Sequence, residues 1–367
     1  MRGFNDTYDT RIDQWALNSA FGRLNYAFDN KYYVEFNFRY DASSRFAKGN
    51  RGAFFPSFSA AWRITDEEFM APLKKIGDLK LRGSWGQLGN QQIISNYGYL
   101  NVFTTVSNMY GFNNLPQPGS SFAVGNPVIT WESANSTNIG FDLSLLNNRL
   151  TVSYDYFHKM TDNILLQLPA PGLYGATPAF QNAGKIRNQG FELAVNYRAT
   201  TGKVEHIIGA NIADNLNEIV DFKGRTFIQE GDVTYINREG FPISSYYGYQ
   251  ADGFYQTPDD IKNSPRPTFV NDVKPGDIKY VDRNKDGVID NNDRFIMGNP
   301  FPRYTYGFNY AVNWNGFDAS IFVRVWVNVM CTCAVKVLRR SIITGITCTH
   351  STSIAGHPTT RTRITRA

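Results

Sequence analysis

Apolar and polar residues alternate strictly between residues 304 and 314. A period of two is that of a β-strand, whose successive side chains point to opposite faces of a sheet. We therefore expect a strand with one aromatic face and one face of small and polar residues. The aromatic face carries Tyr304, Tyr306, Phe308, Tyr310, Val312 and Trp314, and the other carries Thr305, Gly307, Asn309, Ala311 and Asn313.

The same alternation recurs in earlier segments. Charged or polar residues occupy every second position of the first one, where Glu35 and Arg39 stand between aromatic and aliphatic neighbours. Each run has about ten residues, the length a tilted strand needs to cross a bilayer core, and no segment approaches the roughly twenty apolar residues of a membrane helix. The pattern therefore predicts an all-β protein. The earlier segments are residues 34–41, 138–145, 150–156 and 191–198.

The connections between these segments are of two kinds. Tight hairpin turns are expected at four dipeptides, because Asn and Gly tolerate the positive φ that such turns require. The other connections are long, rich in Gly, Pro, Asn and aromatic residues, and lack a clear period. The expected turns are Asp29-Asn30, Asn147-Asn148, Thr201-Gly202 and Asn315-Gly316, and the long connections are Gln91 to Val128, Thr161 to Asn188 and Asn217 to Pro302.

Short turns at one rim and long loops at the other are typical of an outer-membrane barrel. A soluble sandwich would bury the aromatic face against a second sheet and would space its strands more evenly. A propeller would show a repeat near forty residues, which this chain lacks. The pattern favours a transmembrane antiparallel β-barrel with its aromatic face toward lipid and its polar face toward water.

Composition agrees, and it also separates the C-terminal part of the chain from the rest. Aromatic residues make up 15% of the sequence and mean hydropathy is −0.36, as expected when half of each strand faces water. The formal charge of +5 arises from the tail, because seven of the 37 basic residues and none of the 32 acidic ones lie from Arg324 onward. Cys331, Cys333 and Cys348 lie there too, so the body offers no disulfide or thiol-metal signal.

The tail is predicted to be read in a shifted frame. Taking the third base of each codon with the first two of the next can turn SIITGITCT at Ser341 to Thr349 into YYNWYNMY, and AGHPTT at Ala355 to Thr360 into WTPNN. The alternative is a naturally basic disordered tail, which would not be expected to decode so consistently. We therefore divide the chain into a barrel part, 1–323, and a non-native tail, 324–367, whose arginines are no nucleic-acid patch. The polar start at Met1 has no secretory leader pattern, which favours an internal fragment of a longer protein.

Five blocks in this sequence are similar to the C-terminal barrel half of SusC/RagA-type TonB-dependent outer-membrane transporters. They span nearly everything from Trp15 to Val323, in the order that the family has them. The blocks are FGRLNYAFDNKYYVEFNFRYDASSRF with FFPSFSAAWRI, then LKLRGSWGQLGNQQI, GKIRNQGFELAVNY and GDIKYVDRNKDGVIDNNDRFIMGNPFPRYTYGFN.

The resemblance implies a barrel, usually of about twenty-two strands, with an N-terminal plug that this chain lacks. It also implies import of oligosaccharides, peptides or similar nutrients, with a SusD-like surface lipoprotein and the TonB complex as partners and outer-membrane lipid around the barrel. This chain alone is not expected to be competent for transport. The alternative is a non-transporting outer-membrane adhesion or carbohydrate-binding β protein.

An acidic loop between residues 282 and 293 has the spacing of a calcium loop. Alternating Asp and Asn side chains on a tight loop can converge on one point, and calcium takes six to eight oxygen ligands. The last position is Asp293 rather than the usual Glu, and the flanking segments are expected to be extended. A solvated turn held by side-chain hydrogen bonds is the alternative. The candidate ligands are Asp282, Asn284, Asp286, the Val288 carbonyl, Asp290 and Asp293.

Aromatic residues in two of the long connections are candidates for contact with a substrate or partner. Aromatic side chains offer flat apolar area with a polar group at one end, which suits sugar rings and protein surfaces alike. Loop packing or a membrane-interface girdle is the alternative. The candidates are Tyr97, Tyr99, Phe103 and Tyr110 in one loop and Tyr246, Tyr247 and Tyr249 in another.

No catalytic function is expected. His158 and His206 lie outside any Ser/Asp arrangement, and the sequence contains no G-x-S-x-G, H-E-x-x-H or P-loop motif. Acidic residues on the polar face, such as Glu35, Asp142 and Glu192, are expected to set the polarity of the lumen.

Overall fold

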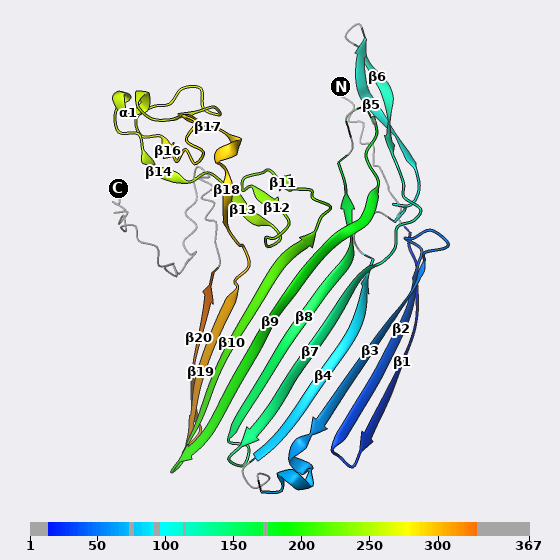
Figure 1. Ribbon diagram of the computed structural model, residues 1–367, viewed down its shortest axis with the longest axis vertical. Helices are drawn as coiled ribbons and strands as arrows, with labels where there is room; N and C mark the ends of the chain where they lie inside the picture. The colour runs from blue at the N-terminus through cyan, green and yellow to red at the C-terminus, as the bar shows by residue number, and fades with distance from the viewer. Residues whose placement is uncertain are drawn as a thin grey trace, which may run out of the picture.

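The computed structural model describes residues 14–72, 77–91, 96–112, 115–169, 171, 173 and 175–328. In this part of the chain, ten strands form one antiparallel sheet with β1 and β20 at its two edges, so the sheet is open (Figure 1). Within the described residues, no helix is long and apolar enough to span a membrane. In sheet order the strands are β1 (Leu17–Phe28), β2 (Tyr32–Ser43), β3 (Gly52–Arg63), β4 (Gly77–Asn90), β7 (Glu132–Leu145), β8 (Leu150–Gln167), β9 (Phe180–Thr201), β10 (Val204–Asp221), β19 (Tyr304–Trp314) and β20 (Phe317–Val327).

The four predicted hairpin turns are confirmed, and all lie at the same end of the sheet, the lower end in Figure 1. All of their residues except Thr201 adopt the left-handed backbone, which Asn and Gly favour. A fifth connection at this end, between β3 and β4, carries the short 3-10 helices η1 (Ile64–Asp66) and η2 (Glu68–Met70). The positive φ angles are 51° at Asp29, 50° at Asn30, 53° at Asn147, 64° at Asn148, 62° at Gly202, 47° at Asn315 and 84° at Gly316.

The opposite end carries the long connections, which contain more regular structure than the sequence pattern predicted. The prediction of a loop from Thr161 to Asn188 was wrong, because β8 and β9 continue through most of it and reach 18 and 22 residues. The alternation breaks there because the β8–β9 register shifts between Thr161 and Leu165, which moves side chains between faces. The backbone ladder continues through these irregularities.

Small sheets fill the other two long connections. One connection forms a hairpin, and the other folds into a four-stranded sheet, two two-stranded sheets and one helical turn (Figure 1). The hairpin strands are β5 (Val102–Phe112) and β6 (Leu115–Ala123). The other elements are β11 (Phe227–Gln229), β12 (Tyr235–Asn237), β13 (Ser245–Gly248), β14 (Ala251–Phe254), α1 (Pro258–Lys262), β15 (Arg266–Pro267), β16 (Ile278–Tyr280), β17 (Val288–Ile289), η4 (Asn291–Asp293) and β18 (Phe295–Gly298).

The buried apolar residues gather where the strands pass into the long connections. Phe46, Phe55, Ile129, Trp131 and Leu165 form one cluster there. A second cluster consists of Ile186, Ile219 and Phe222. The middle of the sheet instead exposes its large side chains, such as Ile139 at 62% and Phe308 at 45%. This distribution fits a sheet whose outer face contacts hydrocarbon and whose inner face is wet.

The buried Glu132 accepts a hydrogen bond from Leu165, a member of the first cluster. Its side chain is only 5% exposed, and one oxygen accepts the backbone N–H of Leu165 at 2.8 Å while the other accepts the Asn90 side-chain amide at 3.2 Å. Leu165 lies at the register shift of β8, where the regular ladder does not supply every partner. Glu132 therefore accepts from a backbone N–H group that the irregular strand pairing would leave without an acceptor.

The last strand includes the start of the predicted tail. Arg324 pairs with Gly307 across β19 and β20, and β20 ends at Val327. Residues 329–367, with all three cysteines, lie outside the described residues. The prediction of a frame shift from Arg324 stays a prediction.

Candidate functional site

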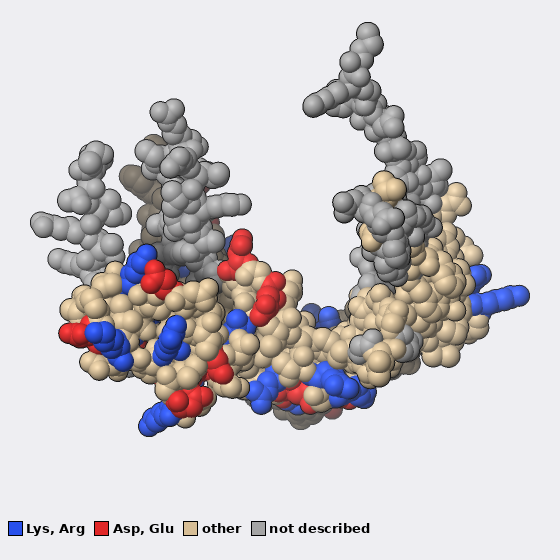
Figure 2. All heavy atoms as spheres, turned by 90° about the horizontal axis from the view of Figure 1, so that it is seen from above, with Lys and Arg blue, Asp and Glu red and all other residues tan. Residues whose placement is uncertain are grey.

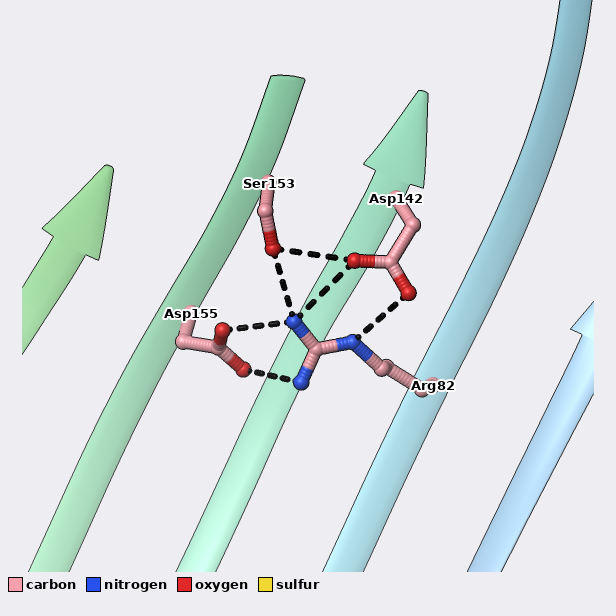
Figure 3. A network of polar contacts seen from close by, with 4 residues as sticks. All are labelled: Arg82, Asp142, Ser153 and Asp155. Atoms are coloured by element: carbon pink, nitrogen blue, oxygen red, sulfur yellow. Dashed lines mark hydrogen bonds and ion pairs between the residues drawn. The ribbon is translucent and has the colours of Figure 1, made fainter. Parts of the chain in front are cut away.

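A network of charged side chains crosses three strands on the polar face (Figure 3). Arg82 on β4 contacts Asp142 on β7, with Nε to Oδ2 at 3.2 Å, and Asp155 on β8, with Nη1 to Oδ1 at 2.5 Å and Nη2 to Oδ2 at 2.6 Å. Ser153 accepts from the same guanidinium at 3.1 Å and donates to Asp142 at 2.9 Å. A forked pair of this kind is among the strongest polar contacts available to a protein.

Strand register explains how one arginine reaches two strands away. Arg82 is opposite Gly140 on β7, and Gly140 is in turn opposite Asp155 on β8. A Cβ at Gly140 would lie 2.4 Å from the Tyr154 carbonyl oxygen and 2.6 Å from Asp155 Oδ1. The missing side chain thus leaves the space through which the guanidinium reaches Asp155.

Further charged pairs line the polar face. Arg23 on β1 pairs with Glu35 on β2, and Arg187 on β9 pairs with Glu218 on β10 at 2.5 Å. At the loop end, seen from above, basic and acidic side chains lie interspersed on the described surface (Figure 2). The polar face can therefore hold water and polar solutes, and carboxylates such as Glu35, Asp142 and Glu218 are paired with arginines there.

The polar face has a large hollow toward its loop end. Its volume is about 920 Å³, and Arg23, Arg39 and Asp41 are among its lining residues, together with Phe55 and Trp131. Arg39 Nε lies 2.7 Å from Asp41 Oδ2. The indole Nε1 of Trp131 donates to the Arg51 carbonyl, which holds that ring in place. The hollow thus combines fixed charges with aromatic area.

The acidic loop is closed by its own hydrogen bonds. Asp282 accepts from the backbone N–H groups of Lys285 at 2.6 Å and Gly287 at 2.8 Å. Asn284 accepts from the backbone of Asp286, and Asp286 from the backbone of Val288. Asp290 caps η4 by accepting from the backbone of Asn292 at 2.7 Å. The predicted extended flanks are confirmed as β16 and β18.

Asp293 is the fully buried anchor of this loop. One carboxylate oxygen accepts from the backbone N–H groups of Arg283 at 2.8 Å and Asn284 at 3.4 Å, and the other from Asp290 at 2.9 Å. Burial acts to raise the pKa of Asp293, but these donors outweigh it and hold the pKa below its ordinary value. Within the described residues, no group of three or more His, Cys, Asp or Glu is placed to hold a metal. Calcium in this loop stays a prediction.

Among the candidates of the first loop whose side chains are described, Tyr97, Tyr99 and Phe103 have different surroundings. Tyr97 is half-exposed and its hydroxyl donates to the Gln14 carbonyl at 3.3 Å, while Tyr99 packs against the first buried cluster. Phe103 is 72% exposed and its ring lies 4.7 Å from that of Phe122 on the paired strand β6. Tyr110 lies on β5, and its side chain is outside the described part of the molecule.

In the second loop, Tyr246 and Tyr249 have different surroundings. Tyr246 is 6% exposed and packs against Tyr235, so it supports the small sheet, and Tyr247 follows it on β13. Tyr249 stacks on Phe269 with ring centres 4.8 Å apart, and the Arg294 guanidinium lies 5.2 Å over its ring.

Tyr280 completes an aromatic trio with Tyr249 and Phe269, at 5.5 and 5.6 Å respectively. The sequence pattern missed Phe269 and Tyr280 as members of this cluster. Phe269 stands in a stretch without periodicity, and only the fold of the loop brings it to Tyr249.

His206 lies on the aromatic face near the β9–β10 turn. Its Nδ1 lies 2.8 Å from the hydroxyl of Tyr310, and the two rings stack. This contact joins β10 to β19 and involves no nucleophile or acid.

Comparison with known proteins agrees with this geometry. The family model of the TonB dependent receptor-like β-barrel matches residues 2–329. TonB-dependent receptor P3 of Formosa agariphila is 34% identical over 86% of this chain and 32% of its own length. TonB-dependent receptor SusC of Bacteroides thetaiotaomicron is 31% identical over 85% of this chain and 31% of its own length.

Among solved structures, one of the RagAB peptide transporter superimposes with a TM-score of 0.68 at 25% identity, covering 86% of this chain and 33% of that one. The chain thus spans about a third of the length of the proteins it matches. The expectations of a barrel, an outer-membrane location and a non-enzymatic protein are confirmed. The chain belongs to the TonB-dependent receptor-like β-barrel family, in its SusC/RagA-like branch.

Proposed function

We propose that this chain forms part of the barrel wall of a TonB-dependent importer of oligosaccharides, peptides or similar nutrients. The observation that carries the proposal is the division of the sheet into two faces. One face exposes aromatic and aliphatic side chains, and the other holds paired charges such as the network around Arg82. A wall of this kind separates lipid from a wet passage.

The proposed partners follow from the family. A SusD-like surface lipoprotein would sit at the long-loop end, and the TonB complex would act on the complete transporter from the short-turn side. The RagAB peptide transporter, to which this chain is similar, supports the first partner. Tyr97, Phe103 and Tyr249 are the proposed contacts at the loop end, since they combine exposed or stacked aromatic area with that position.

Calcium is proposed as a structural ligand of the loop from Asp282 to Asp293. The support is that its Asp and Asn residues have calcium-loop spacing and lie on one short turn that their own hydrogen bonds close. Titration of calcium against the loop, read by hydrogen exchange at Gly287 and Val288, tests the proposal. Unchanged hydrogen exchange at millimolar calcium would contradict calcium binding and support a turn that is closed by hydrogen bonds alone.

The importer proposal is tested by deleting the complete gene and measuring growth and uptake on a panel of oligosaccharides and peptides. We expect the deletion strain to lose uptake of one nutrient class, and a strain that lacks TonB to lose the same uptake. Unchanged uptake combined with lost attachment of cells to glycans would instead establish the adhesion alternative.

A further inference from the structure

The aromatic face of the sheet has a dent where four strands meet. Val34, Ala60, Gly83 and Ile139 stand opposite one another across β2, β3, β4 and β7. The two central positions carry a methyl group and a hydrogen, while the neighbouring row consists of large side chains. The result is an apolar groove of about 320 Å³ along the outside of the wall. The neighbouring row is Tyr32, Trp62 and Leu81.

The groove lies on the outer face, in the middle of the sheet and away from its open edges. Each of its four strands is paired on both sides, so the open edges at β1 and β20 do not create it. The backbone does not require the small residue at Gly83 either. A Cβ at that position would meet only the Asn138 carbonyl oxygen at 3.9 Å, which is ordinary contact. The space is therefore available to an occupant and could accept a larger side chain.

One end of the groove is polar. The rings of Tyr32 and Trp62 stack with centres 6.4 Å apart and planes at 14°. The Tyr32 hydroxyl and the Trp62 indole N–H both donate to Glu67 Oε1, at 2.5 and 3.0 Å. Lys31 Nζ lies 4.0 Å from the other oxygen. Glu67 stands between η1 and η2, so this polar end lies at the short-turn rim.

In a wall that faces lipid, a groove is either filled by a lipid chain or left empty, and then its lining side chains lack neighbours. Side chains lining an empty space forfeit the dispersion attraction that neighbouring atoms would supply. Flexible hydrocarbon can follow a narrow groove, and aromatic residues with polar tips mark the depth at which hydrocarbon gives way to head groups. The groove also continues the surface that the barrel already presents to the bilayer.

We propose that this groove holds one acyl chain of a phospholipid from the leaflet on the short-turn side. The chain lies over Ala60 and Gly83, and the head group lies beside Tyr32, Trp62 and Lys31. This site rests on the outward orientation of the aromatic face and is independent of what the barrel transports.

The test uses the complete polypeptide in outer-membrane vesicles supplemented with a phospholipid that carries a photoactivatable group in its acyl chain. After irradiation, mass spectrometry maps the labelled peptides. Labelling is expected to concentrate several-fold on Ala60–Trp62 and Leu81–Gly83 relative to the lipid-facing residues of β9 and β10. Even labelling over the whole aromatic face, or label on a copurifying protein in place of the groove, would overturn the proposal.

Filling the groove supplies the matched comparison. Ala60→Val adds two methyl groups inside it, and Ala210→Val adds the same groups on the aromatic face of β10, away from it. The first change should remove the excess labelling and the second should leave it in place. Heat-dependent electrophoretic migration reports whether each variant is folded, and Gly83→Val provides a second filled groove. Excess labelling that persists in both folded, filled variants contradicts the proposal.

Discussion

Arg82 and Asp155 form a forked ion pair although a whole strand lies between them. Both nitrogens of the fork contact the carboxylate within 2.6 Å, and Asp142 and Ser153 complete the network. The pair joins β4 to β8 above the backbone ladder of β7. Three strands of the wall are therefore held in register by side chains as well as by main-chain hydrogen bonds.

Removing Arg82 should weaken the barrel, because Arg82→Ala leaves Asp142 and Asp155 facing each other without a cation. The expected loss is about 1.5–3 kcal/mol in the free energy of unfolding, the range for hydrogen bonds to charged groups. Urea unfolding of the complete barrel in vesicles measures it. A double-mutant cycle with Asp155→Ala should show a coupling energy well above zero, and simple additivity would contradict the pairing.

Two glycines on adjacent strands should respond oppositely to alanine. Gly140→Ala places a Cβ 2.4 Å from a backbone oxygen and displaces Asp155, so it should destabilise the barrel. Gly83→Ala meets nothing closer than 3.9 Å and should stabilise it by about 0.4–1 kcal/mol through the unfolded chain. The melting temperatures of both variants measure these effects. Equal shifts would show that the close approach of the backbone oxygen to Gly140 does not affect stability.

Asp293→Ala should open the acidic loop. The change leaves the backbone N–H groups of Arg283, Asn284 and Asp290 without their acceptor, at about 1–3 kcal/mol for a buried donor. Hydrogen exchange at these three amides should accelerate. Asp272→Ala is the control, since Asp272 is exposed and its ion pair within the described residues is with its near neighbour Lys274. Exchange that stays slow in the Asp293 variant would mean that other contacts hold the loop.

The helical turn α1 should loosen at low pH. The hydrogen bond from Lys279 holds the pKa of Asp260 below its ordinary value of 3.8, and the N–H of Gln256 adds to this. A lowered pKa means that the folded loop is stabilised above the ordinary pKa and loses that stability as pH falls through the lowered one.

Hydrogen exchange of residues 256–264, corrected for its intrinsic pH dependence, measures this effect. Asp260→Asn should remove the acid-dependent step. An identical acid response in the variant would assign the step to another carboxylate.

Sequencing the DNA across Arg324 tests the reading frame. If the tail is shifted, the corrected frame should encode aromatic and turn residues where the present one has threonines, because an outer-membrane strand needs an aromatic face. Peptide mass spectrometry that finds the present tail in the mature protein would establish the basic tail instead.

The sequence by itself determined the five alternating strands β2, β7, β8, β9 and β19, the four tight turns and the two faces of the sheet. These follow from local rules, since a period of two sets which side chains share a face, and Asn and Gly set where the chain reverses. The alternation around Val34 and that around Tyr304 both appear in the structure as predicted.

Tertiary structure decided what depends on neighbouring strands. Arg82, Gly140 and Asp155 are far apart in sequence, and only the register of β4, β7 and β8 aligns them. The extension of β8 beyond its alternating segment includes a backbone contact with Glu132, which lies on β7. The groove at Ala60 and Gly83 likewise exists only because two small residues, 23 positions apart, are paired across a sheet. Cross-strand pairing is set by the backbone ladder and the whole wall, so no single segment encodes it.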